Sequence, residues 1–126
     1  MIKIIFCIRK LPGLTDGEFQ RYWREDHADL VRQAAGPLNI RRYVQSHAFS
    51  DQRLTPMIDA RGIEAAPYDG VAELWWDDMD AILAAGATKE GRAAGRRLLE
   101  DEKRFIDLKA SPLFYAYEHE IIALTD

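Results

Sequence analysis

The pattern of apolar and polar residues predicts a strand and then a long helix at the start of the chain. Residues 2–8 (IKIIFCI) form a short apolar, β-branched run, which is typical of a buried strand. Thr15 and Glu18 then have the spacing of a capping box, in which each residue satisfies a backbone N–H of the other. We therefore expect a helix that begins after Thr15 and ends before the Gly-Pro pair at 36–37.

The next segment predicts a second strand and a long loop. Residues 39–49 (NIRRYVQSHAF) alternate with a period of two, which places Tyr43, Gln45 and His47 on one face of the strand. Residues 50–67 lack clean periodicity, and their Pro, Asp and Gly content indicates a loop with about one turn of helix. A loop this long in a small domain is often a lid or a binding loop.

The second half of the chain repeats this order. Residues 68–76 (YDGVAELWW) predict a third strand, and an Asp pair after it caps a short helix. Thr88 caps a longer helix that we expect to extend over residues 89–108, and residues 113–122 (LFYAYEHEII) predict the last strand. We interpret residues 1–126 as a single domain with the order βαββαβ.

Two βαβ units in this order predict an α+β, ferredoxin-like fold with a four-stranded antiparallel sheet. Two helices can cover only one face of such a sheet. The first strand is nevertheless apolar on both faces, whereas a solvated face would give a clean alternation. We therefore expect a homodimer in which the two sheets pack face to face.

Composition and charge exclude several classes of protein. The net charge is −4, with 17 basic and 21 acidic residues and no basic block, so a nucleic-acid partner is not expected. No apolar run approaches the ~18 residues of a membrane span, and the N-terminus does not resemble a signal peptide. The single cysteine, Cys7, lies in an apolar strand, which favours a buried thiol in a cytoplasmic protein. No zinc, calcium, dinucleotide or P-loop motif is present, so we expect neither metal nor cofactor.

Two titratable residues interrupt the apolar side of the first helix. At about 100° per residue, Asp26 falls within the apolar arc, and His27 falls on its shoulder above Trp23. An imidazole titrates near neutral pH and can act as a general base or acid, with Asp26 orienting it or binding a substrate hydroxyl. The alternative is that His27 bonds a backbone carbonyl and that Asp26 reaches the edge of the interface.

Other candidates come from the strands and the long helix. The polar face of the second strand is a candidate wall opposite His27, or else the solvated face of an edge strand. Asp101 and Glu102 straddle an apolar stripe on the long helix; acids in such positions are usually solvated, and Glu102 is our candidate for the pocket. The candidate catalytic residues are His27, Asp26, Tyr43 and His47. The candidate substrate-binding residues are Tyr22, Trp23, Gln45, Trp75, Trp76, Glu102 and Phe105.

The run EFQRYWREDHADLV (residues 18–31) resembles the F-x-x-Y-[WY]-x-x-x-H-x-x-[LV] signature of EthD-domain proteins. The later segments RRYVQSHAF, DGVAELWWDD and DEKRFIDLKASPLFYAYEHEI are similar to the corresponding segments of that family. The resemblance implies a dimeric α/β barrel in which ligands bind between helices and sheet. It assigns the motif histidine to His27 and the strand motif to Tyr43, Gln45 and His47, and it does not extend to Asp26.

The resemblance also implies a function. Related proteins are similar to polyketide cyclases, dehydratases or decarboxylases and to muconolactone-type isomerases, which use His, Tyr or Asp without a cofactor. We therefore expect an acid/base enzyme (a lyase, cyclase, dehydratase or isomerase) for a small cyclic, aromatic or polyketide-like substrate. Two alternatives are a carrier of a small hydrophobic ligand and a dimer whose pocket is filled by its own side chains. A solid core with no cavity beside His27 would favour the last.

Overall fold

The apolar strand at the start of the chain is central in the sheet. In the computed structural model, which describes residues 1–125, β1 (Ile2–Ile8) pairs with β3 (Gly70–Trp76) on one edge and β4 (Leu113–Tyr117) on the other. β2 (Arg42–His47) pairs with the far edge of β3. The sheet order is therefore β2-β3-β1-β4, and every pair is antiparallel. The predicted α+β, ferredoxin-like architecture is confirmed.

The first helix begins where its capping box predicts. Thr15 Oγ1 accepts a hydrogen bond from the Glu18 backbone N–H at 3.1 Å, and the Glu18 carboxylate accepts one from the Thr15 N–H at 2.9 Å. The helix is one continuous rod with an irregular middle: α1 (Asp16–Tyr22), a wide π-helical turn η1 (Trp23–His27) and α2 (Ala28–Ala34). It ends before the Gly-Pro pair, as predicted.

Two further helices connect β3 to β4. Asp78 caps α4 (Met79–Ala87), and Thr88 caps α5 (Lys89–Glu102), each through a side-chain oxygen that accepts a backbone N–H at 2.9 Å. The two helices approach closely at Gly91, where a Cβ atom would lie 1.9 Å from a backbone oxygen of α4. Only glycine fits there, so this residue fixes the angle between the two helices.

α5 ends at Glu102, six residues before its predicted end at residue 108. The chain turns away because its backbone is bonded to the segment that follows β1. Leu11 donates to the Phe105 carbonyl at 3.0 Å, and Ile106 forms a bridge with Lys10. A short helix, η3 (Leu108–Ala110), then leads into β4. The apolar stripe that suggested a longer helix continues instead as a buried loop.

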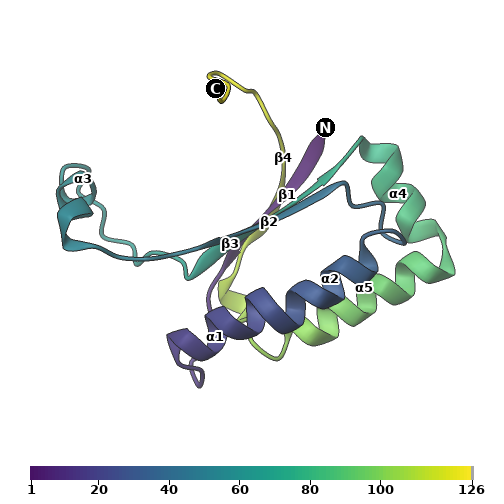
Figure 1. Cartoon of the computed structure of the whole chain (residues 1–126), viewed down its shortest axis with the longest axis horizontal. Helices are drawn as coiled ribbons and strands as arrows, with labels where there is room; N and C mark the ends of the chain where they lie inside the picture. The colour runs from purple at the N-terminus through teal and green to yellow at the C-terminus, as the bar shows by residue number, and fades with distance from the viewer. Residues whose placement is uncertain (126) are drawn as a thin grey trace.

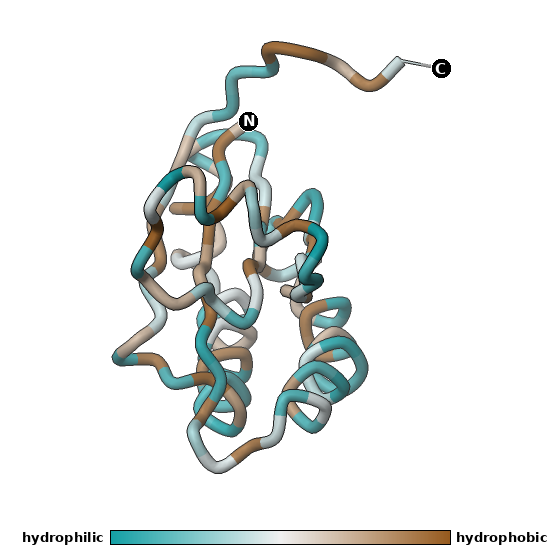
Figure 2. Tube along the Cα trace, turned by 90° about the vertical axis from the view of Figure 1, so that its left-hand side faces the viewer, coloured by the Kyte–Doolittle hydropathy of each residue, from teal (hydrophilic) through white to brown (hydrophobic). Residues whose placement is uncertain are grey.

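Two segments extend away from the body of the molecule (Figure 1). Residues 48–67 form an arm that contains η2 (Gln52–Leu54) and α3 (Thr55–Asp59), so the predicted turn of helix is present. All side chains from 52 to 67 are exposed, and the arm points away from α1, α2 and α5 rather than over them. Residues 118–125 leave the sheet after β4, so the last strand is shorter than predicted (Figures 1 and 2).

The helices form one layer and the sheet forms the other (Figure 2). The core lies between them and has two parts. The larger part joins α1 and η1 to the sheet and the loop after α5: Phe6, Ile8, Phe19, Trp23, Ala72, Phe105 and Ile106. The smaller part joins α2 to α5: Val31, Ala34, Ala94 and Leu98. No helix of the described chain is both long and apolar enough to cross a membrane.

The face of the sheet away from the helices has no covering element within residues 1–125. Strand alternation places Val44, Ile5 and Phe114 on this face in one cross-strand row, with Glu73 of β3 between Val44 and Ile5. Trp75 also lies there, with the cations of Lys3 and Arg42 at 4.9 and 4.6 Å from its ring, so that its indole is only 5% exposed.

Candidate functional site

The wide turn η1 decides which of two neighbouring polar residues faces the sheet. An α-helix rotates about 100° per residue, whereas the i→i+5 bonds of a π-helical turn reduce this to about 80°. Counted from Trp23, Asp26 therefore rotates from about 60° to about 120° away, toward solvent, whereas His27 stays within about 40° of Trp23. His27 is 5% exposed, and Asp26 is exposed. The prediction that Asp26 points toward the sheet is wrong, because it assumed an α-helical phase throughout.

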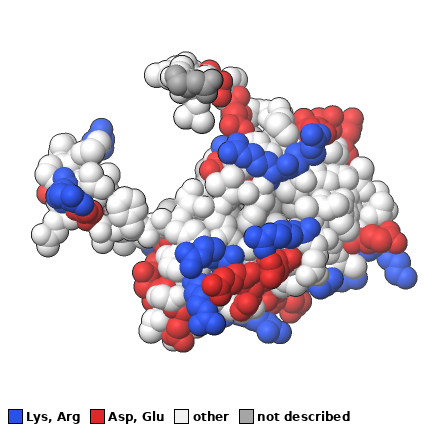
Figure 3. Space-filling view, in the orientation of Figure 1, with Lys and Arg blue, Asp and Glu red and all other residues white. Residues whose placement is uncertain are grey.

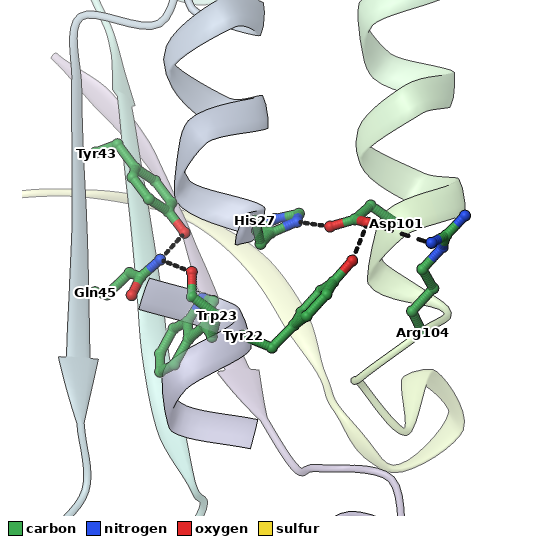
Figure 4. A network of polar contacts seen from close by, with 7 residues as sticks. All are labelled: Tyr22, Trp23, His27, Tyr43, Gln45, Asp101 and Arg104. Carbon is green, nitrogen blue, oxygen red and sulfur yellow. Dashed lines mark hydrogen bonds and ion pairs between the residues drawn. The ribbon is translucent and has the colours of Figure 1, made fainter. Parts of the chain in front are cut away.

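A carboxylate from α5 takes the role that the sequence suggested for Asp26. His27 Nδ1 lies 2.8 Å from Asp101 Oδ2, and both side chains are buried (Figure 4). The Tyr22 hydroxyl donates to the other oxygen, Asp101 Oδ1, at 2.5 Å. A carboxylate accepts hydrogen bonds, so Nδ1 carries the imidazole proton and Nε2 has a free lone pair. No group within residues 1–125 hydrogen-bonds Nε2.

The surroundings keep this histidine neutral and its tyrosine neighbour protonated. Burial lowers the pKa of His27, although the Asp101 carboxylate raises it by a smaller amount. Burial and the hydrogen bond to Asp101 raise the pKa of Tyr22 to about 12. Arg104 Nε lies 4.0 Å from Asp101 on its outer side. His27 is thus an uncharged base whose partner can stabilise the cation formed when it takes up a proton.

A cavity of about 40 Å³ lies beneath His27, between the helices and the sheet. This volume holds about one water molecule. Three of its wall residues can exchange protons: His27 from η1, Tyr43 from β2 and Glu102 from α5. The other wall residues are apolar or aromatic: Phe6, Ile8, Trp23, Val31, Ala72, Leu74, Leu98 and Ile106. A polar group that entered this space would have few partners other than these three.

The polar face of β2, formed by Tyr43, Gln45 and His47, is directed toward the helices. The sequence alone did not decide between this face and the opposite one. The Gln45 side-chain amide donates to the Trp23 carbonyl and to the Tyr43 hydroxyl, both at 2.9 Å (Figure 4). The His47 ring stacks on Trp23 with 4.3 Å between ring centroids, and its two nitrogens contact the side-chain oxygens of Gln20 and Gln45. Of these residues, Tyr43 lines the cavity beneath His27, whereas His47 lies outside it.

The two adjacent tryptophans do not wall this cavity. Neighbouring residues of a strand point to opposite faces, and Trp75 points to the face without helices. Trp76 lies on the helix side, but its indole N–H donates to the Leu38 carbonyl at 2.7 Å, away from the cavity. The prediction that Trp75 walls the pocket is wrong, and Trp76 is a core residue.

The aromatic residues predicted around His27 do gather there. Phe105 lies after the end of α5, yet its ring centroid is 4.9 Å from that of His27 and 5.2 Å from that of Tyr22. Trp23 lines the cavity. These rings exclude water from the histidine, which is the physical cause of its lowered pKa.

Asp101 was the functional residue that the sequence did not select. It lies three residues after Leu98 and three residues before Arg104, within the apolar stripe, and is 7% exposed. The position of Asp101 within the apolar stripe was therefore visible in the sequence. Which of Asp101 and Glu102 faces His27 depends on the rotation of the helix about its axis, which the sequence does not give. Glu102 lines the inner cavity, whereas Asp101 lines an outer groove of about 450 Å³ between α2 and α5.

The outer groove is lined by both positive and negative side chains, not by charges of one sign. Arg96, Arg97 and Glu100 line it together with Asp101 and Arg104. Figure 3 shows Lys and Arg interspersed with Asp and Glu over the helices. Within residues 1–125, no three His, Cys, Asp or Glu side chains gather in a way that would hold a metal ion.

Comparisons with known proteins agree with this fold. A model of the EthD domain matches residues 11–109. Similar solved structures include an EthD family protein from Bacillus halodurans (20% identity, TM-score 0.62, covering 94% of this chain and 99% of that chain). An EthD-like protein from Ralstonia eutropha has 16% identity and a TM-score of 0.58, with 91% of this chain and 88% of that chain covered. A dimeric protein of ferredoxin-like fold from Bacteroides fragilis has 11% identity and a TM-score of 0.56, with 94% and 95% covered. The search of curated proteins found no match.

Proposed function

This chain belongs to the EthD family, and we propose that it is a cofactor-independent acid/base enzyme that moves a proton next to the carbonyl group of a small cyclic, aromatic or polyketide-like compound. One observation carries the proposal. His27 is buried, its Nδ1 is held by Asp101, its Nε2 has no hydrogen-bond partner within residues 1–125, and its side chain lines a cavity. A base in this state is poised to accept a proton from a carbon acid.

The reaction would begin at His27 Nε2. The base removes a proton from the carbon next to the carbonyl group, and the resulting imidazolium is stabilised by Asp101 at 2.8 Å. Tyr22 holds the carboxylate in place through its own hydrogen bond. Return of the proton to another carbon gives an isomerisation, and loss of a leaving group gives an elimination. Both outcomes need only the residues named here.

The body of a substrate needs more room than the cavity has. A groove of about 270 Å³ between α2 and β2 shares Val31 and Tyr43 with the cavity, so these two side chains border both spaces. We propose that the substrate lies in this groove and that its reactive end passes Val31 and Tyr43 to reach His27. Arg32, Arg41 and Arg42 also line this groove, so the cationic and apolar side chains of its wall would contact the body of the substrate.

The alternative is a carrier for a small hydrophobic ligand. Hydrophobic binding does not require an imidazole that is held by a carboxylate and lines a cavity. Buried titratable groups next to a cavity are more typical of a reactive site. This reasoning supports the enzyme over the carrier.

Hydrogen–deuterium exchange tests the proposal without knowledge of the product. Small cyclic ketones and lactones are incubated with the protein in D₂O, and NMR follows the loss of the proton next to the carbonyl group. We expect the wild-type protein to accelerate exchange for at least one compound and His27→Gln to reduce the rate to background. Equal acceleration by His27→Gln would refute the assignment of the base.

We also propose that two copies associate through the uncovered faces of their sheets. Support comes from the apolar residues Ile5, Val44 and Phe114 on that face and from the dimeric protein of similar fold. Light scattering after size exclusion should give the mass of a dimer for the wild-type protein and of a monomer for Ile5→Lys. Leu99→Lys, on the exposed side of α5, is the matched control and should stay dimeric. A dimeric Ile5→Lys would contradict this interface.

A further inference from the structure

Two neighbouring acids of α5 serve different sides of the helix–sheet interface. Asp101 accepts hydrogen bonds from His27 and Tyr22 and lines the outer groove. Glu102, the next residue, lines the inner cavity, and no group within residues 1–125 hydrogen-bonds its carboxyl group. The Asp101 carboxylate is thus committed to positioning the base, whereas the Glu102 carboxyl group is free to bind something in the cavity.

The cavity favours the protonated form of Glu102. Burial among apolar side chains and the negative charge of Asp101 raise the pKa of Glu102 to about 7. The other titratable groups of the cavity are His27, which burial keeps neutral, and Tyr43. None of them supplies a positive charge that would favour the carboxylate. Glu102 therefore spends much of its time as a carboxylic acid, which can donate a hydrogen bond.

Tyr43, another residue of the cavity wall, has a hydroxyl group that can donate a hydrogen bond. Its hydroxyl oxygen accepts the Gln45 amide N–H at 2.9 Å, and that amide is fixed because it also donates to the Trp23 carbonyl. The Tyr43 proton must therefore point elsewhere, and the Tyr43 side chain lines the cavity. Burial raises the pKa of Tyr43, so the proton stays on the oxygen.

We propose that the Tyr43 hydroxyl group and the Glu102 carboxyl group, which line the cavity with His27, together bind the carbonyl oxygen of the substrate and stabilise the enolate that forms when His27 removes the adjacent proton. This inference rests on the function proposed above. In the step, the C–H electron pair forms a C=C bond, the carbonyl π pair moves to oxygen, and the proton moves to His27 Nε2. Two neutral donors at the developing negative charge, in a site without bulk water, lower the barrier to this step.

The pair also defines the class of substrate. The cavity has room for about one water-sized group, so a carbonyl oxygen fits and a larger polar group does not. Both donors are uncharged, and the nearest fixed charge is the Asp101 anion, so a neutral ketone or lactone is favoured over a carboxylate at this end. A carrier that binds its ligand only through hydrophobic contacts would not need these two hydrogen-bond donors.

Infrared spectroscopy tests the pair without turnover. The probe is cyclopentanone labelled with ¹³C at its carbonyl, whose stretching band moves to lower frequency when the oxygen accepts hydrogen bonds. We expect a shifted band for the bound probe in the wild-type protein and loss of about half of this shift in Tyr43→Phe and in Glu102→Leu. Glu102→Gln keeps a donor and should keep the shift. Tyr115→Phe and Glu100→Gln, at exposed positions on β4 and α5, are the matched controls.

The outcomes separate this inference from the proposed base. His27→Gln should keep the shifted band, because His27 does not contact the carbonyl oxygen, even though it abolishes proton exchange. In the wild-type protein the shift should decrease as the pH rises through about 7, and in Glu102→Gln it should not. An unshifted band in the wild-type protein, absence of a bound probe, or an unchanged shift in both Tyr43→Phe and Glu102→Leu would overturn the inference.

Discussion

His27 and His47 show how two histidines of one fold can have the same chemistry but different roles. Both lie between helix and sheet, both contact aromatic rings, and burial lowers the pKa of both, with Arg24 also lowering that of His47. His47 has both ring nitrogens against amide oxygens. His27 has one nitrogen on Asp101 and the other beside a cavity. Both His47 nitrogens are in contact with protein atoms, so this ring has a packing role. One His27 nitrogen has no such contact, so this ring can react with a substrate.

The pair of substitutions His27→Gln and His47→Gln should give the largest contrast. We expect His27→Gln to lower the rate of proton exchange by at least about 10²-fold, the usual contribution of a general base, and His47→Gln to lower it less than about threefold. The measurement is the NMR exchange assay on the same ketone. Similar losses in the two variants would remove the distinction between the two sites.

Asp101→Asn should have the next largest effect. The amide cannot stabilise the imidazolium, and its NH₂ group faces a donor at either His27 or Tyr22, so one buried hydrogen bond is lost. We expect unfolding by urea to show a loss of about 2 kcal/mol. Exchange activity should fall about tenfold or more. Glu100→Gln is the exposed control on the same helix. A fully stable and active Asp101→Asn would show that the carboxylate does not position His27.

The pH dependence of stability should separate the histidines more finely. The folded-state pKa of His27 lies below its ordinary value of 6.5, so the unfolded chain binds the proton more tightly. Stability is then fully present above pH 6.5 and decreases as the pH falls toward the folded-state pKa. We expect His27→Gln to reduce the loss of stability between pH 7.5 and 5.5, measured by urea unfolding at both pH values. The less buried His47 should contribute less, and an unchanged profile in His27→Gln would contradict its burial as a neutral base.

Asp26→Asn should have almost no effect. The side chain is exposed after the wide turn, and surface substitutions of this kind change the free energy of unfolding by less than about 0.5 kcal/mol. Thermal unfolding and exchange rate should both match the wild-type protein. A tenfold loss of activity would mean that Asp26, rather than Asp101, serves His27.

The local signals of the sequence predicted most of the fold. The capping box at Thr15 predicted the start of the first helix, and the apolar run of β1 predicted a buried strand that is apolar on both faces. The position of His27 in a pocket also followed from the sequence pattern and the family motif. These features depend on residues that are close in sequence, which is why pattern alone could identify them.

The parts that failed depend on contacts distant in sequence. Nothing local marks the change from α- to π-helical turn at Trp23, and this change alone moves Asp26 outward. The choice between Asp101 and Glu102 needed the phase of α5 against His27, and the faces of Trp75 and Tyr43 needed the strand register. An error of one position exchanges the two faces of a strand.

The state of the His27 ring tests the central claim most directly, because it does not require a substrate. Long-range ¹H–¹⁵N NMR of the wild-type protein at pH 7.5 reports which ring nitrogen carries the proton. We expect a neutral His27 with its proton on Nδ1, toward Asp101, and a bare Nε2. A His27 with its proton on Nε2, or a charged ring at this pH, would contradict it.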